Sequence, residues 1–143
     1  MTVITRQALV PYEAEQMYRL VDNIEAYAEF LPWCSSATVL SRAAEQVEAS
    51  IQIEHSGLKK SFTTRNTLEP GTAISMQLVE GPFKHLHGVW RFHALGAEGC
   101  KVSLKLEFEF SSKLLGMTFG KVFNHIAGNL VDAFIQRAGD VYG

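Results

Sequence analysis

Apolar residues recur with two different periods along the chain, and the changes of period divide it into three parts. Residues 2–10 are apolar on both sides and predict a buried strand. Apolar positions at helical spacing then predict a helix over residues 12–22. A second short helix is predicted from Ala26 to Phe30, because a helix ends before a proline and Pro32 follows. Residues 33–36 are expected to form a loop.

Between residues 47 and 110 the apolar positions recur at every second residue, which predicts half-buried antiparallel strands. Glycine and proline at Gly57, Pro70-Gly71 and Gly81-Pro82 indicate turns between them. The alternation is clearest from Cys100 to Phe110, where even-numbered residues are apolar and odd-numbered ones are polar. We therefore predict about six antiparallel strands after the two short helices.

The helical period returns after Phe110 and continues to the end of the sequence. It predicts one long helix over residues 113–142, whose apolar face packs on the sheet. That face consists of Leu115, Phe119, Val122, Ile126 and Leu130. A straight helix does not fit flush on a curved sheet, so a gap between the two is expected. The order of elements predicts an α+β fold.

Composition narrows the classes of protein that fit this pattern. The chain has 143 residues and a net charge of −2, with 47% hydrophobic and 20% charged residues. This length fits one domain over residues 1–143. The charge is too low for a general nucleic-acid-binding protein, so we expect no DNA partner. Neither a membrane span nor a signal peptide is expected, and Cys34 and Cys100 form no C-x-x-C motif. We therefore expect a cytoplasmic protein with reduced cysteines.

The basic residues are concentrated in the second part of the sequence. Residues 1–56 carry eight acidic and three basic side chains, whereas residues 57–143 carry seven acidic and ten basic ones. Four of the latter have outward strand parity and form the predicted basic patch: Lys59, Arg65, Lys101 and Lys105. Glu107 and Glu109 share that face and weaken the patch, so a solvated sheet surface is the alternative.

Motifs for nucleotide binding or a catalytic triad are absent from the sequence, so no catalytic residue is predicted. His85, His87 and His93 share one strand face, but no cysteine or aspartate lies on that strand, and we predict no metal site. His55 and His125 are expected to be core residues.

Polar residues on an otherwise apolar face indicate a binding cavity. Thr64 and Asn66 lie between Phe62 and Leu68 on the inward side of a predicted strand. A buried polar group needs a partner, which is either another protein group or a ligand. An apolar cavity with a few polar groups is the usual form of a small-molecule site. We predict the following cavity residues: Tyr27, Phe30, Trp33, Phe62, Asn66, Phe83, Trp90, Phe92, Phe108, Leu115, Phe119 and Phe123.

Several short motifs resemble one known family when they are taken in order. They are Ala8-Leu9-Val10-Pro11-Tyr12, Phe30-Leu31-Pro32 with Cys34, Phe62-Thr63-Thr64-Arg65-Asn66, Gly81-Pro82-Phe83-Lys84, Phe108-Glu109-Phe110 and Phe119-Gly120. Nearly end to end, the chain resembles START-like, helix-grip proteins of the polyketide cyclase/coenzyme Q-binding family. The resemblance implies a sheet wrapped around the C-terminal helix and enclosing an apolar tunnel. Trp33 departs from the small residue expected there, and it is expected to narrow the tunnel mouth.

The resemblance implies two roles and no enzyme activity for this branch of the family. The first is binding of ubiquinone or a similar polyprenyl lipid in support of respiration, with no obligatory cofactor and with peripheral membrane contact. The alternative is a toxin that binds the large ribosomal subunit and blocks subunit joining, for which the basic patch is the candidate contact. A cyclase or dehydratase that uses His55, Asn66 or Glu80 as acid and base is a third, weaker hypothesis. One fold can host both a carrier and a toxin, so the sequence does not choose between these two.

Overall fold

The computed structural model describes residues 1–97 and 99–143. These residues fold into a single curved antiparallel sheet covered by a layer of helices. In these residues the seven strands lie in the order β1-β7-β6-β5-β4-β3-β2. The elements are β1 (Thr2–Val10), α1 (Ala14–Asp22), the 3₁₀ turn η1 (Ile24–Ala26), α2 (Tyr27–Phe30), β2 (Cys34–Arg42), β3 (Gln46–His55), β4 (Leu58–Glu69), β5 (Ala73–Glu80), β6 (Phe83–Ala94), β7 (Cys100–Phe110), α3 (Lys113–Gly128) and α4 (Leu130–Tyr142).

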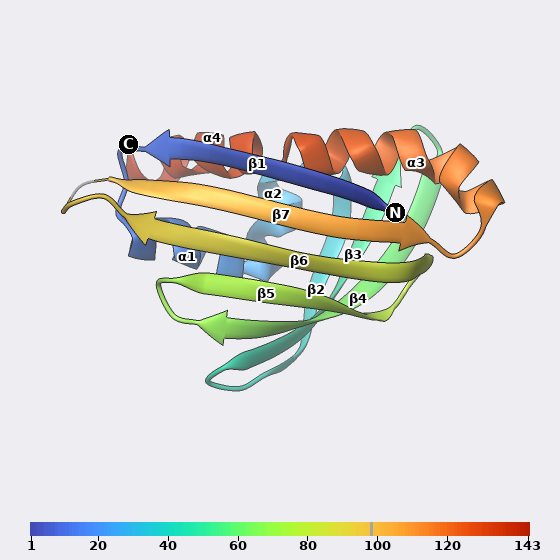
Figure 1. The fold of residues 1–143 in the computed structure, drawn as a ribbon, viewed down its shortest axis with the longest axis horizontal. Helices are drawn as coiled ribbons and strands as arrows, with labels where there is room; N and C mark the ends of the chain where they lie inside the picture. Colours follow the sequence, from blue (N-terminus) through green and yellow to red (C-terminus); the bar gives the residue numbers. More distant parts are fainter. Residues whose placement is uncertain (98) are drawn as a thin grey trace.

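The strands curl around the C-terminal helices, as the family resemblance implies. Strands β2 to β7 follow one another as a meander, and β1 returns to pair with β7 from Thr2 opposite Phe108 to Val10 opposite Cys100. Figure 1 shows α3 and α4 running nearly in line behind β1 and β7, while β2, β3 and β4 cross behind at a steep angle. The predicted α+β helix-grip fold is confirmed.

The C-terminal helix is interrupted at Asn129, so the predicted uninterrupted helix over 113–142 is wrong at this point. The cause is local hydrogen bonding. The Asn129 side-chain amide donates to the His125 carbonyl at 2.7 Å, and Arg6 donates to the Gly128 carbonyl at 3.2 Å. These donors satisfy carbonyls that a helix end leaves without partners. The Ala133 amide then bonds to the Asn129 carbonyl at 3.1 Å and begins α4.

Two strand predictions also need correction. Residues 34–36 belong to β2 and not to a loop, and the register of β2 against β3 shifts between Cys34 and Ser36. An irregular start of this kind hides the period of two. The first strand is not buried on both sides, because Val3 and Leu9 are 53% and 73% exposed. The outer face of this edge strand has no covering layer.

The buried apolar residues form two clusters along the helices. Trp90 and Phe134 belong to a cluster beneath α1, α2 and α4. Phe108 and Phe119 belong to a second one beneath α3. Met76 is among the half-buried residues that pack against both clusters. The helix interruption at Asn129 therefore coincides with a division of the core.

The turn between β5 and β6 offers a test of how tightly the sheet packs. Gly81 has φ +155°, and a Cβ there would lie 2.6 Å from the Cβ of Phe62. We expect Gly81→Ala to lower the free energy of unfolding by about 2–3 kcal/mol, because strain and overlap add. Gly57→Ala is the matched control, since its φ is +80° but no atom lies within 4 Å of the added Cβ. It should cost about 1 kcal/mol. If urea unfolding gave the same loss of free energy for both variants, the contact between the added Cβ and Phe62 would be relieved by a small shift and would cost nothing.

Candidate functional site

An apolar cavity of about 80 Å³ lies between the two core clusters, near the interruption of the C-terminal helix at Asn129. Strands β3 to β7 form its floor, and α3 and α4 form its roof. The lining residues are Ile24, Tyr27, Trp33, Ala49, Ile51, Ile53, Phe62, Thr64, Asn66, Met76, Leu86, Trp90, Leu106, Phe123, Ile126, Ala127, Leu130 and Phe134. The gap expected from a helix lying on a curved sheet is therefore present.

Six of the predicted cavity residues line this space: Tyr27, Trp33, Phe62, Asn66, Trp90 and Phe123. The other six do not, which corrects the predicted site: Phe30, Phe83, Phe92, Phe108, Leu115 and Phe119. Three of these six fill the second core cluster with other phenylalanine rings: Phe83, Phe108 and Phe119.

The remaining three lie outside the cavity for different reasons. Phe92 stacks on the far side of Trp90, and Tyr18 packs against its ring. The Phe30 ring packs edge-on against the Phe134 ring. The Arg137 guanidinium lies over the Phe30 ring, 4.9 Å from the centroid of that ring. Leu115 is only half-buried in the first turn of α3.

A polar pair is buried among the apolar cavity walls. The Thr64 hydroxyl donates a hydrogen bond of 2.9 Å to the Asn66 side-chain carbonyl, and both residues are about 5% exposed. Internal pairing, the alternative to a ligand, therefore accounts for the Thr64 hydroxyl. Among the described residues no protein group accepts from the Asn66 amide nitrogen. The Asn66 amide is thus a polar donor that the cavity presents to whatever occupies it.

Burial keeps three ionisable side chains in their neutral form: Tyr27, Cys34 and Cys100. The Tyr27 hydroxyl donates to the Val21 carbonyl, and burial raises its pKa strongly. Burial also raises the pKa of the Cys34 and Cys100 thiols, and both are free cysteines. Because a thiol reacts as its thiolate, neither cysteine is placed to act as a nucleophile at neutral pH.

The residues considered for acid and base catalysis do not meet at the cavity. His55 is exposed and contacts the Ser56 hydroxyl, and Glu80 is exposed at the end of β5. Only Asn66 lines the cavity. His125 is exposed too, so both histidines expected in the core lie at the surface. In the described part of the chain no three His, Cys, Asp or Glu residues come together in a way that could hold a metal.

The four predicted basic residues share the outer face of the sheet but do not form one patch. Lys59 and Arg65 lie on β4, whereas Lys101 and Lys105 lie on β7, with β5 and β6 between them. The β4 pair faces carboxylates on β3: Lys59 is opposite Glu54, and the Arg65 guanidinium is 3.5 Å from Glu48.

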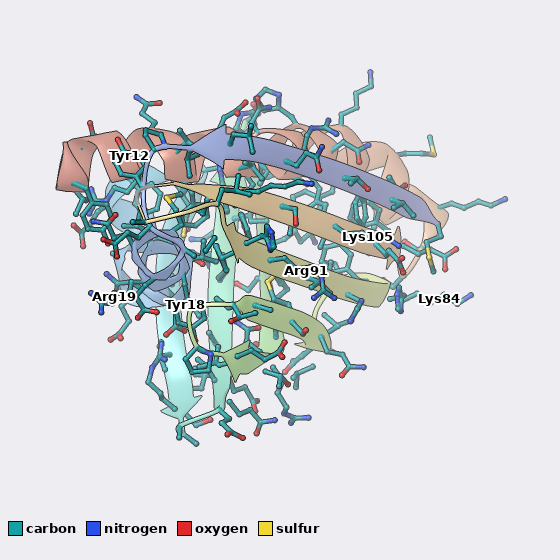
Figure 2. All side chains as sticks on the ribbon, turned by 60° about the vertical axis from the view of Figure 1, so that its left-hand side comes forward. Tyr12, Tyr18, Arg19, Lys84, Arg91 and Lys105 are labelled. Atoms are coloured by element: carbon teal, nitrogen blue, oxygen red, sulfur yellow. The ribbon has the colours of Figure 1, made fainter. Side chains whose placement is uncertain are left out.

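Arg91 on β6 is a basic residue that the predicted site omitted. It lies on the outer face near Lys105, as Figure 2 shows. Arg91 has the same outward parity on its strand as the four predicted basic residues have on theirs, so the sequence pattern could have identified it.

Comparison with known proteins identifies the family of the chain. Residues 10–135 match the family described as polyketide cyclase / dehydrase and lipid transport. The chain belongs to this family. The matched range runs from the end of β1 into α4, and it includes every residue that lines the cavity. The family expected from the motifs is therefore confirmed.

Relatives of known name fall into two groups. The chain is 49% identical over 143 residues to the ribosome association toxin RatA of Vibrio cholerae, covering 100% of this chain and 99% of the relative. It is 46% identical over 142 residues to RatA of Escherichia coli, covering 99% of this chain and 90% of the relative. It is 28% identical over 137 residues to the mitochondrial coenzyme Q-binding protein COQ10 homolog B of Xenopus laevis, covering 92% of this chain and 56% of the relative.

Solved structures share the fold over nearly the whole chain. An 18 kDa protein from Caulobacter crescentus is 30% identical with a TM-score of 0.77, covering 100% of this chain and 99% of that chain. The Zhui aromatase/cyclase of a Streptomyces species has a TM-score of 0.83 at 18% identity, covering 96% of this chain and 93% of that chain. At so low an identity, the second likeness concerns the fold alone.

Most of the lining residues that sequence reasoning missed come from inward strand positions and from the helix interruption. Met76, Leu86 and Leu106 have the inward parity of their strands, so the signal was present. Leu130 and Phe134 line the cavity because α4 begins beside it. The missing information was where the two core clusters separate.

The buried polar pair predicts an asymmetric response to mutation. Asn66→Leu leaves the Thr64 hydroxyl without its acceptor, so we expect a loss of about 1–2 kcal/mol in the free energy of unfolding. The double variant Thr64→Val/Asn66→Leu removes both partners at similar volume and should unfold within about 0.5 kcal/mol of wild type. Urea unfolding of the three proteins measures this. A double variant less stable than Asn66→Leu would mean that the pair has a structural role beyond its own hydrogen bond.

Proposed function

We propose that this chain is a non-enzymatic ribosome association factor of the RatA type, which binds the large ribosomal subunit and hinders subunit joining. The observation that carries the proposal is the 46–49% identity to proteins named RatA over nearly the whole of both chains. The coenzyme Q-binding relative is far more distant, at 28% identity. Whole-chain similarity at the higher level supports a shared partner more strongly than a shared fold does.

Two features of the structure support this order of the candidates. The cavity of about 80 Å³ is smaller than the 150 Å³ cavity that admits benzene, so it does not hold a polyprenyl chain without rearrangement. Two of the three residues considered for acid and base chemistry, His55 and Glu80, are exposed and do not line the cavity. The outer face of the sheet, by contrast, is open and carries basic side chains on β6 and β7.

Binding to isolated ribosomal subunits tests the proposal directly. The purified chain should co-sediment with large subunits, show little binding to small subunits, and lower the yield of joined ribosomes when the subunits are mixed. Because phosphate contacts release counterions, binding should weaken steeply between 50 and 200 mM salt. Equal sedimentation with both subunits, or unchanged subunit joining, would contradict the proposal.

As a second candidate, we propose that the cavity admits the head group of ubiquinone or a similar polyprenyl quinone at a membrane surface. The Asn66 amide donor and the apolar walls favour it, because a quinone head combines carbonyl acceptors with an apolar ring. The long, flexible Met76 side chain and the half-buried Trp33 are the lining groups that would have to move. No helix in the described part of the chain is long and apolar enough to cross a membrane.

Mass spectrometry of organic extracts distinguishes this candidate. If the cavity holds a quinone, the purified wild-type protein should yield close to one quinone per chain. The Thr64→Val/Asn66→Leu variant should yield at least fivefold less, because the polar donor is lost while the fold is kept. Lys59→Gln, a surface change, is the control. Extracts without quinone, or equal amounts from all three proteins, would contradict quinone binding.

A further inference from the structure

The outer face of β6 combines basic and aromatic side chains without a carboxylate. Its outward residues are His85, His87, Val89, Arg91 and His93. Arg91 and His93 are exposed, and no carboxylate in the described residues forms an ion pair with Arg91. Since most sheet faces mix both signs of charge, this one-sided composition marks β6 as a surface that favours anions.

Strands on one side of β6 extend this surface with further hydrogen-bond donors. The register of β6 against β7 places Lys101 opposite His93, Ser103 opposite Arg91, and Lys105 opposite Val89. On β1, Gln7 lies opposite Ser103 and Thr5 opposite Lys105. Neighbouring strands are about 4.8 Å apart, so these side chains lie within reach of one another.

The same rows form a shallow groove of about 410 Å³. Its polar lining consists of Thr5, Gln7, His87, Arg91, Ser103, Lys105 and one carboxylate, Glu107. Figure 2 shows Arg91 and Lys105 side by side on the sheet, on the face turned away from the helices. The groove, which we call the β1–β7–β6 groove, thus brings two cations together with hydroxyl and amide donors.

The carboxylates near the groove are confined to one end of it. Glu107 lines that end opposite His87, and Glu109 lies two residues further along β7, opposite His85. The Lys105 ammonium is 3.4 Å from Glu107, but the lysine side chain is 61% exposed. An ion pair this exposed is screened by water and contributes little, so Lys105 can exchange this partner for a phosphate.

We infer that the β1–β7–β6 groove is the surface through which the chain contacts ribosomal RNA, with Arg91 and Lys105 on the phosphate backbone. This inference rests on the proposed ribosome association and names the surface responsible for it. Arginine, lysine, hydroxyl and amide donors are the groups that bind RNA phosphates and sugars. Histidine rings stack on unpaired bases, which suits His87 and His93 beside the cations.

The basic residues of β4 provide an internal contrast. Lys59 lies opposite Glu54, and Arg65 pairs with Glu48 at 3.5 Å. Each of the two cations therefore faces a carboxylate across the strand pair, whereas in the groove only Lys105 has a carboxylate partner and Arg91 forms no ion pair with a described residue. The inferred RNA surface excludes this half of the predicted basic patch.

Two double variants with the same change in net charge test the surface. Arg91→Gln/Lys105→Gln removes two cations from the groove, and Lys59→Gln/Arg65→Gln removes two from β4. Co-sedimentation with large ribosomal subunits is measured at 50 and 200 mM salt. We expect the groove variant to bind at least tenfold more weakly at 50 mM salt and the β4 variant to bind within twofold of wild type. The ratio of wild-type affinity to groove-variant affinity should fall by about tenfold between 50 and 200 mM salt, since the variant lacks two of the phosphate contacts that make binding salt-dependent.

The outcomes separate the inferred surface from the proposed function. Thermal unfolding of both variants should match wild type, because the four replaced side chains are exposed. If wild type binds and both variants bind equally well, the groove is only a solvated surface and the inference fails, while ribosome association stands. Equal weakening of both variants would show a diffuse charge effect and also overturn it. If wild type itself does not bind large subunits, the proposed function fails.

Discussion

Packing of two helices into the concave side of one curved sheet is the constraint on which the rest of the structure depends. A single straight helix touches such a surface along a short length only. The interruption at Asn129 divides the apolar face between α3 and α4, and each helix packs on its own core cluster. Asn129 and Arg6 satisfy the carbonyls that the interruption exposes. Burial of each phenylalanine side chain beneath these helices stabilises the folded state by about 1.5–3 kcal/mol. This gain exceeds the modest cost of ending one helix early.

The cavity is a consequence of this packing before it is a binding site. It lies where the two core clusters separate, and aromatic rings such as Trp90 and Phe123 close it on either side. The buried Thr64–Asn66 pair brings polarity into it. A family that includes cyclases and lipid carriers can enlarge such a space and add chemistry to it. In this chain the space is small, and of the candidate acid and base residues only Asn66 lines it.

The period of apolar residues predicts most of the strands and helices and their buried faces correctly. It does not predict the features that depend on packing, which are the helix interruption and the walls of the cavity. The alternation from Cys100 to Phe110 identified the buried and outward faces of β7 correctly, because a strand with one covered face must alternate. The long apolar face after Phe110 likewise predicted the C-terminal helices, but not their interruption, since Asn129 interrupts through side-chain hydrogen bonds that the period does not record. Phe83, Phe108 and Phe119 were assigned to the cavity because inward parity does not separate cavity walls from solid core.

Strand alternation also explains how one small domain can carry two independent surfaces. On β7, Leu104 and Leu106 face the helices, while Ser103 and Lys105 face outward. A change on one side therefore leaves the other side in place, since successive side chains point to opposite faces. Basic residues added to the outer face cost the core nothing, and the cavity can shrink without altering the outer charges. Changes that reshape the cavity and changes that alter the outer charge can therefore accumulate independently on the same strands.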